Sequence, residues 1–357
     1  MSHPDAKHRP ASRESNPREQ GANPWEASAA ETTVKVGLNA AIVGVDEDKP
    51  LVMTVRYDET VSNAEAGRED QGIPGLPFGP FEPHRHRTLD SGLRQWVAEQ
   101  TDLQLGYAEQ LYTFGDRGRE FEFGGGPRII SVGYLALTNR VSDDPAPLAS
   151  WEDWYRYFPW EDWRDTEPPV LAEVIRPALI RWAERAEMGP ERDHKRERAA
   201  LCFGSDGIAW DEEKVLDRYE LLYEAGLVYE AARDRGPRPD TPERPLGLPM
   251  RFDHRRILAT AMSRLRGKLK YRPVVFELMP PTFTLFELQR VVEAISGVRL
   301  HKQNFRRFVE KSGLVETTGD ISTQTGGRPA ARYRFRREVL LERLSAGVRF
   351  SATISKR

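Results

Sequence analysis

Five side chains with the chemistry to read base edges or to hold phosphates lie close together near the carboxyl end of the chain: Lys302, Gln303, Asn304, Arg306 and Arg307. Cationic and amide groups of this kind contact bases and phosphates in protein–DNA complexes. A helix across positions 301–311 would turn these groups to solvent and the apolar side chains between them inward. The pattern predicts a nucleic-acid recognition helix; the alternative is a structural helix with a solvated basic face.

The segment before this helix has the capping and turn signals of a helix-turn-helix. Thr284 is an expected N-cap, and Glu287 three residues later completes a capping box for the orphan backbone N–H groups. Apolar residues at helical period continue to Ser296, where Gly297 permits a sharp turn before a second helix near His301. We expect Thr284 and His301 to belong to the DNA-contacting set.

Two short β-rich runs after the second helix predict a β-wing. They lie at 313–319 and 328–336 and flank the turn DISTQTGG. Arg328, Arg332 and Arg334 lie on the second run. On a wing, these arginines would rest against the phosphate backbone or enter the minor groove, so we include them among the expected DNA contacts.

The positive charge of the chain is concentrated in the same region. Residues 251–357 hold 23 Lys and Arg against 9 Asp and Glu, a balance of +14, while the remainder holds 30 against 46, a balance of −16. A basic segment on an acidic body localises affinity for a polyanion. We therefore expect double-stranded DNA as a partner, although basic side chains scattered over the surface would give the same balance.

Length and composition set the remaining limits. A chain of 357 residues is longer than a domain with a single hydrophobic core usually is. No apolar run is long enough to cross a bilayer, the amino terminus lacks the apolar stretch of a signal peptide, and the single Cys202 permits no internal disulfide or cysteine metal cluster. We expect a cytoplasmic protein with no membrane partner and a disordered tail over residues 1–31.

The amino-terminal half predicts two strands, a Gly/Pro-rich loop, a helix over 88–100 and two further strands. The next segment opens with the tryptophan-rich SWEDWYRYFPWEDW and then shows helical periodicity over 170–187 and 213–235. A Pro-rich connector leads into a long basic helix over 252–271, which we expect to bridge the two halves. The apolar stripe of the 213–235 helix is expected to face the core, or alternatively a dimer seam: Leu216, Leu221, Leu222, Ala225 and Val228.

The stretch 76–106 resembles the Nudix family, whose enzymes hold Mg²⁺ with glutamates of the pattern G-x5-E-x7-R-E-U-x-E-E-x-G-U. Aligned to that pattern, Gln95 replaces the arginine, Trp96 and Gln100 replace glutamates, and only Glu99 keeps its carboxylate. The basic run HRHR at 84–87 stands where the remaining glutamate would lie. One carboxylate among neutral and cationic groups is a poor ligand set for catalytic metal ions, whereas an anionic diphosphate can still bind there.

Together with FTLFELQ, NFRRF and GRPAARYRF, this degenerate box resembles the Nudix-related transcriptional regulators of the NrtR type, most closely the longer, NadQ-type repressors of NAD biosynthesis. The resemblance implies an α+β fold. A Nudix-like α/β/α sandwich would span 32–270 with a mostly helical insertion at 139–247, followed by a winged helix-turn-helix at 271–345 and a tail at 346–357. It also implies a homodimeric repressor that binds operator DNA and an effector that is NAD, ADP-ribose or an ATP-like adenine nucleotide.

The resemblance further implies that no residue is catalytic and none binds a metal ion. The effector contacts that it implies, with an ordinary surface position as the alternative for the arginines, are Arg56, Phe81, His86, Arg87, Tyr112, Phe114, Arg117, Arg119 and Arg128. An enzyme alternative is an active Nudix-type nucleotide pyrophosphatase with a rearranged carboxylate set of Glu82, Asp90 and Glu99. A third alternative is a metabolite-binding module that does not bind DNA.

Overall fold

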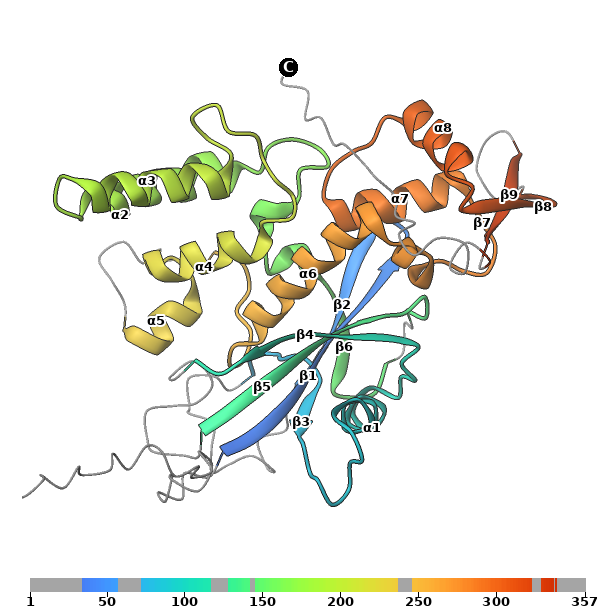
Figure 1. Ribbon diagram of the computed structural model, residues 1–357, viewed down its shortest axis with the longest axis horizontal. Helices are drawn as coiled ribbons and strands as arrows, with labels where there is room; N and C mark the ends of the chain where they lie inside the picture. The colour runs from blue at the N-terminus through green and yellow to red at the C-terminus, as the bar shows by residue number, and fades with distance from the viewer. Residues whose placement is uncertain are drawn as a thin grey trace, which may run out of the picture.

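The computed structural model describes residues 34–56, 72–116, 128–141, 145–236, 246–322, 329–336 and 338 (Figure 1). Its amino-terminal half is built on a mixed sheet with the order β4-β5-β1-β2-β6, and β3 pairs with β1 beside this path. β1 and β5 run parallel, whereas the β1–β2, β4–β5 and β2–β6 pairs are antiparallel. The strands are β1 (Val34–Asp46), β2 (Lys49–Val55), β3 (Phe78–Pro80), β4 (Tyr107–Phe114), β5 (Arg128–Leu137) and β6 (Ala149–Asp153).

Alternation along β1 gives the sheet two buried faces. Leu38, Ala40 and Ile42 pack with helix α1 (Leu89–Thr101), while Ala41 and Val43 join the core under helix α6 (His254–Tyr271). Successive side chains of a strand point to opposite faces, so one strand lines both cores. Figure 1 shows α1 and α6 on opposite sides of the sheet, which is the α/β/α sandwich expected from the sequence.

The segment between the sheet and α6 differs from the prediction in two respects. It first adds β6 to the sheet, so the helical part begins only after Asp153. The single helix expected over 213–235 is two helices, α4 (Val215–Ala225) and α5 (Tyr229–Arg235), because Gly226 takes a left-handed conformation with φ +79° and ends α4. Before them come a π-helical turn (Leu171–Ile175), α2 (Arg176–Glu184) and α3 (Pro190–Phe203).

The apolar stripe predicted over 213–235 faces the interior of its own chain. Leu221, Leu222, Ala225 and Val228 are at most 1% exposed, and Leu216 packs against the same cluster. The core-facing interpretation is therefore correct, and these side chains are not available for a dimer seam.

The carboxyl-terminal module has the element order and the sheet of a winged helix. A 3-10 turn (Pro273–Leu278) leads to β7 (Phe283–Thr284), α7 (Leu285–Ser296), α8 (Lys302–Ser312), β8 (Val315–Ser322) and β9 (Ala330–Phe335). β8 and β9 are antiparallel, and β7 joins them in the order β7-β9-β8. The predicted helix-turn-helix and wing are both present, and the α+β fold class is confirmed. Within the described ranges, no helix has the length and apolar character that a membrane crossing requires.

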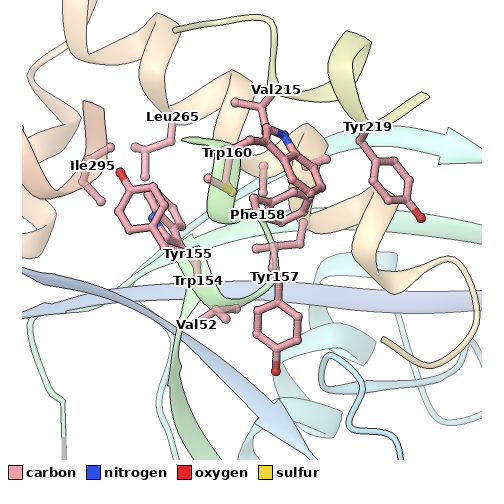
Figure 2. Close-up of a cluster of buried hydrophobic side chains, with 14 of the residues drawn as sticks. Val52, Trp154, Tyr155, Tyr157, Phe158, Trp160, Val215, Tyr219, Leu265 and Ile295 are labelled. Atoms are coloured by element: carbon pink, nitrogen blue, oxygen red, sulfur yellow. The ribbon is translucent and has the colours of Figure 1, made fainter. Parts of the chain in front are cut away.

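The tryptophan-rich segment fills the centre of the larger core. It contains β6 and two 3-10 turns, Trp154–Arg156 and Pro159–Glu161, and its Trp154, Tyr157, Phe158 and Trp160 are 0% exposed. Segments of both halves meet around these rings, so the segment forms the junction of the molecule. Figure 2 shows the rings with Val52 of β2, Val215 of α4, Leu265 of α6 and Ile295 of α7.

Candidate nucleic-acid interface and effector domain

The solvent side of α8 carries the polar side chains expected of a recognition helix. Phe305 and Val309 anchor the helix, because they are only 4% and 2% exposed. The cations and amides that precede Phe305 or lie between it and Val309 therefore point outward from one stretch of chain. The exposed members are the N-cap His301 and Lys302, Gln303, Asn304, Arg306 and Arg307.

Arg306 is oriented by neighbours on two elements. Its Nε donates to the carboxylate of Glu310, one turn further along α8, at 3.1 Å. That hydrogen bond, together with the charge of Glu310 and a hydrogen bond with Tyr333 on β9, holds the pKa of Arg306 above its ordinary value. The guanidinium is a permanent cation that the recognition helix and the wing position together.

The wing arginines have different surroundings. Arg334 is exposed and pairs with Glu316 across the ladder, with 2.7 Å between Nε and Oε1. Arg332 donates to the backbone and hydroxyl oxygens of Thr282 at 3.4 and 3.2 Å. Arg332 therefore braces β9 against the entry to β7, while Arg334 presents its cation to solvent. Arg328 lies outside the described residues.

Thr284 has a structural role, which corrects its expected contact with DNA. Its hydroxyl accepts from the backbone N–H of Glu287 at 3.2 Å, and the Glu287 carboxylate accepts from the N–H of Thr284 at 2.7 Å. These reciprocal bonds are the predicted capping box. Thr284 is only 1% exposed. It therefore caps α7 as a buried residue and is not accessible to a duplex.

Much of the positive charge counted toward DNA binding is neutralised inside the molecule. The cations of α6 form ion pairs with carboxylates from the acidic part of the chain. The net charge of residues 251–357 therefore overstates how basic the surface is. The helix bridges the two halves, as expected, and its charge serves that contact. The pairs are Arg255 with Glu230, Arg256 with Asp116, Arg264 with Glu109, Arg266 with Glu161, Lys268 with Glu109, and Lys270 with Glu212 and Glu213.

At the junction, Glu161 is fully buried between Arg218 of α4 and Arg266 of α6. Its carboxylate accepts from Arg218 at 2.6 and 2.8 Å and from Arg266 at 2.6 Å. Burial by itself would raise the pKa of Glu161, but the two guanidinium groups outweigh burial and hold the pKa below its ordinary value. These ion pairs join the tryptophan-rich segment to both helices.

The same junction holds the carboxyl end of α7, immediately before the turn to α8. The last carbonyls of a helix lack partners within the helix, and a cation placed there also interacts favourably with the helix dipole. Sequence reasoning missed this contact, because no periodic pattern marks its members. The bonded carbonyls are those of Ile295 with Arg266 at 2.9 Å, Ala294 with the Tyr155 hydroxyl at 2.7 Å, and Gly297 with the Trp163 N–H at 2.7 Å.

Helix α1 uses two positions of the degenerate box for packing. The indole N–H of Trp96 donates to the Pro80 carbonyl at 2.9 Å. The Gln100 amide accepts from the N–H of Phe78 at 3.1 Å and donates to the carbonyl of Phe78 at 2.8 Å. Residues that replace glutamates of the family pattern therefore attach α1 to β3.

The acidic residues near α1 are engaged by neighbouring side chains, and Arg85 lies near both Glu82 and Glu99. Glu82 pairs with Arg85, Asp90 with Arg94, and Glu99 accepts from Gln95 at 2.7 Å. Among the residues that the structure describes, no three histidine, cysteine, aspartate or glutamate side chains gather closely enough to hold a metal ion. The carboxylates of the pyrophosphatase alternative are not assembled as a metal site in this region.

The residues expected to contact an effector lie on both faces of the sheet. Phe81 and His86 pack on the α1 side, whereas Tyr112 and Phe114 lie beside Arg264 and Arg256 of α6. The described members therefore do not form one continuous surface. Of the others, Arg56 and Arg87 are exposed, Arg128 begins β5 with its side chain outside the described part, and Arg117 and Arg119 lie outside the described residues.

His86 is the most enclosed of the expected effector contacts that lie on the α1 side. It is 3% exposed and stands between Phe81 and Trp96, with ring centroids 5.9 and 6.2 Å away. Its Nδ1 accepts from the N–H of Glu82 at 3.0 Å, and its Nε2 has no hydrogen-bond partner within the described ranges. A direct effector contact at this nitrogen requires the ring to become more accessible than it is here.

Comparison with known proteins identifies the carboxyl-terminal module. Residues 275–335 match the family model of the NrtR DNA-binding winged helix domain. A curated protein of Acinetobacter baylyi, the ADPR responsive transcriptional repressor NtrR, is 47% identical over 95 residues. The match covers 27% of this chain and 38% of that relative, so it spans well under half of the relative's length.

Two solved structures from Shewanella oneidensis are also similar. NrtR complexed with a 27mer DNA has a TM-score of 0.48 and 20% identity, over 88% of this chain and 98% of that one. The NUDIX domain of NrtR complexed with ADP ribose has a TM-score of 0.28 and 18% identity, over 37% of this chain and 79% of that one. Likeness at this level carries no argument about ligand or partner.

By fold, the chain is an amino-terminal α/β/α sandwich joined to a winged helix. Residues 275–335 match the winged helix of the NrtR DNA-binding type, and the predicted resemblance to regulators of the NrtR type is confirmed for that module.

Proposed function

We propose that the protein is a cytoplasmic, DNA-binding transcriptional repressor of NAD-metabolism genes, whose Nudix-like domain senses an adenine nucleotide without hydrolysing it. The observation that supports this function most directly is the exposed set of cations and amides on α8, within a module of the NrtR DNA-binding type. In a winged helix, such a helix enters the major groove while the wing contacts the backbone. The proposed DNA contacts are His301, Lys302, Gln303, Asn304, Arg306 and Arg307, with Arg334 on the wing and Arg328, which lies outside the described residues.

ADP-ribose is the proposed effector, in preference to NAD and ATP-like nucleotides. A relative described as ADPR responsive supports this choice. The exposed Arg87, before α1, offers charge to a diphosphate in place of metal ions. The engagement of Glu82 and Glu99 by Arg85, and of Asp90 by Arg94, supports binding without catalysis.

A homodimer is the proposed binding species. Two winged helices about 34–36 Å apart would match half-sites one helical turn apart on one side of a duplex. Sedimentation of the full-length protein with and without DNA measures this state directly. A monomer bound alone to a palindromic site would contradict the dimer.

The function is tested by electrophoretic shift with DNA from upstream of the protein's own gene and of NAD-biosynthesis genes. We expect a shift that Arg306→Ala combined with Arg307→Ala abolishes, and an ADP-ribose effect on affinity of about 1–3 kcal/mol. Independent binding of ADP-ribose and DNA would contradict the sensing role. Mg²⁺-dependent turnover of ADP-ribose or NAD that Glu99→Gln abolishes would instead support the pyrophosphatase.

A further inference from the structure

A surface of α7 beside the recognition helix takes no part in the contacts described so far. Phe286, in the first turn of α7, is 51% exposed. A single exposed apolar side chain is ordinary on a protein surface. This ring is different because two cations stand near it: Arg290, one turn further along α7, is 5.8 Å from the ring centroid, and Lys302, the first residue of α8, is 5.9 Å away.

Arg290 also reaches the amino-terminal domain. Its Nη2 is 3.0 Å from a carboxylate oxygen of Asp48, in the turn between β1 and β2, and both side chains are 32% exposed. The backbone carbonyl of Asp48 accepts from Arg164, whose guanidinium is held by Asp162. A carboxylate on a backbone segment held by Arg164 thus contacts the guanidinium of Arg290, which shares the Phe286 ring with Lys302 of the recognition helix.

We propose that Phe286, Arg290 and Lys302 form a second phosphate-binding surface for the duplex, and that Asp48 takes the place of a phosphate at Arg290 when DNA is not bound. The occupant is the phosphodiester backbone, because Lys302 belongs both to this surface and to the recognition helix. A duplex that contacts the first turn of α8 therefore lies next to Arg290. This inference rests on the proposed function, since it requires the duplex that α8 binds.

Charge and geometry support the replacement of Asp48 by a phosphate at Arg290. A guanidinium binds carboxylates and phosphates through the same planar set of donors, so phosphate can replace Asp48 without a new kind of contact. The aromatic ring attracts the two cations and keeps them on one side of α7. Because Asp48 lies in the β1–β2 hairpin, the exchange releases a contact between the winged helix and the sheet that carries the effector domain.

The test measures binding of the full-length protein to a duplex of about 30 base pairs with arbitrary sequence, by fluorescence anisotropy over a series of salt concentrations. Loss of one phosphate contact lowers the slope of log affinity against log salt by about one. We expect Arg290→Ala to show this change and to bind about tenfold more weakly. Asp48→Asn should bind about threefold more tightly, because Arg290 no longer has a competing carboxylate. The double variant should behave like Arg290→Ala.

The matched control is the Arg198–Glu224 pair, which has a similar separation of 2.8 Å and exposures of 35% and 42% but joins two helices of the insertion. Glu224→Gln removes one negative charge as Asp48→Asn does, and Arg198→Ala removes one exposed arginine. Both should leave the salt slope unchanged. Arg290→Lys should retain most of the slope, which separates loss of charge from misfolding.

The outcomes distinguish the two proposals. If wild-type protein binds no duplex, both this inference and the proposed function fail. If wild-type protein binds but Arg290→Ala keeps the full salt slope, the second phosphate surface is refuted and the proposed function stands. The second phosphate surface is likewise refuted, and the proposed function stands, if Asp48→Asn tightens binding no more than Glu224→Gln does.

Discussion

Arg266 of α6 donates from Nε to the carbonyl oxygen of Ile295, in the last turn of α7, at 2.9 Å. Its Nη1 simultaneously holds the carboxylate of Glu161 at 2.6 Å. One planar guanidinium therefore links a buried acid of the tryptophan-rich segment to the helix that precedes α8. The segment includes β6, which pairs with β2, so the placement of the recognition helix depends on residues that are part of the amino-terminal sheet.

Glu161→Gln should lower the free energy of unfolding by about 3 kcal/mol, because it leaves two buried guanidinium groups without a counter-charge. Urea unfolding at pH 7 measures this loss. Glu152→Gln is the control, since its partner Arg156 is 56% exposed and such a pair contributes at most about 1 kcal/mol. Equal effects of the two substitutions would show that the buried acid does not hold the junction together.

The same acid should make stability depend on pH in the acidic range. The guanidinium groups hold the pKa of Glu161 below its unfolded value, so the stabilisation is complete above the unfolded pKa of about 4.3 and is lost as the pH falls through the folded value. The difference in unfolding free energy between wild type and Glu161→Gln should therefore shrink below about pH 4. A difference that stays constant or grows on acidification would contradict this assignment.

His254 should give a second pH dependence, nearer to neutrality. Its Nδ1 accepts from the N–H of Leu76 at 2.9 Å, and burial, aided by the charges of Arg251 and Arg233, lowers its pKa to about 3. The unfolded chain takes up a proton near pH 6.5 and the folded chain does not, so stability is lost as the pH falls from about 6.5 toward 3. The loss between pH 8 and pH 5 should be about 2 kcal/mol. His254→Asn keeps an acceptor without this titration, and its urea midpoint should change less over that range.

Gln100→Glu should destabilise the protein although it brings back a carboxylate of the family pattern. The amide nitrogen of Gln100 donates to the Phe78 carbonyl, and a carboxylate would place an acceptor against that acceptor. We expect a loss of about 1–3 kcal/mol in thermal or urea unfolding, which Mg²⁺ does not reverse. The exposed Gln104→Glu is the control and should change stability little. Stabilisation of Gln100→Glu by Mg²⁺ would indicate that a metal site can still form.

The winged helix could be predicted because its signals are local. The capping box at Thr284, the helix end at Gly297 and the alternation of Phe305 and Val309 with polar residues all act within a few positions, and each is found in the structure. The division of 213–235 also has a local signal at Gly226, but a glycine within an apolar stripe is tolerated in many helices, so the apolar stripe alone predicts one helix.

The junction could not be predicted, because its partners are far apart in the chain. Glu161 meets Arg218 and Arg266 across 57 and 105 positions, and ion pairs between distant segments leave no periodic pattern. The acidic partners of α6 are also distant in sequence. The sequence therefore predicts a DNA-binding surface from cations that are in fact paired with these acidic neighbours. Tyr112 and Phe114 belong to the same predicted set of effector contacts as His86. In the structure, however, the sheet lies between these two side chains and His86.

Thr284→Ala separates a capping role from a DNA contact. Loss of the hydroxyl removes the acceptor for the N–H of Glu287, which should cost about 1 kcal/mol of stability, and Thr284→Ser should restore it. DNA affinity measured well below the unfolding temperature should stay within about twofold, because a side chain 1% exposed does not reach a duplex. Arg306→Ala should show the reverse, with weaker and less selective DNA binding and nearly unchanged stability. If Thr284→Ala weakens DNA binding as strongly as Arg306→Ala while its stability is unchanged, then Thr284 contacts DNA and α7 must move to expose it.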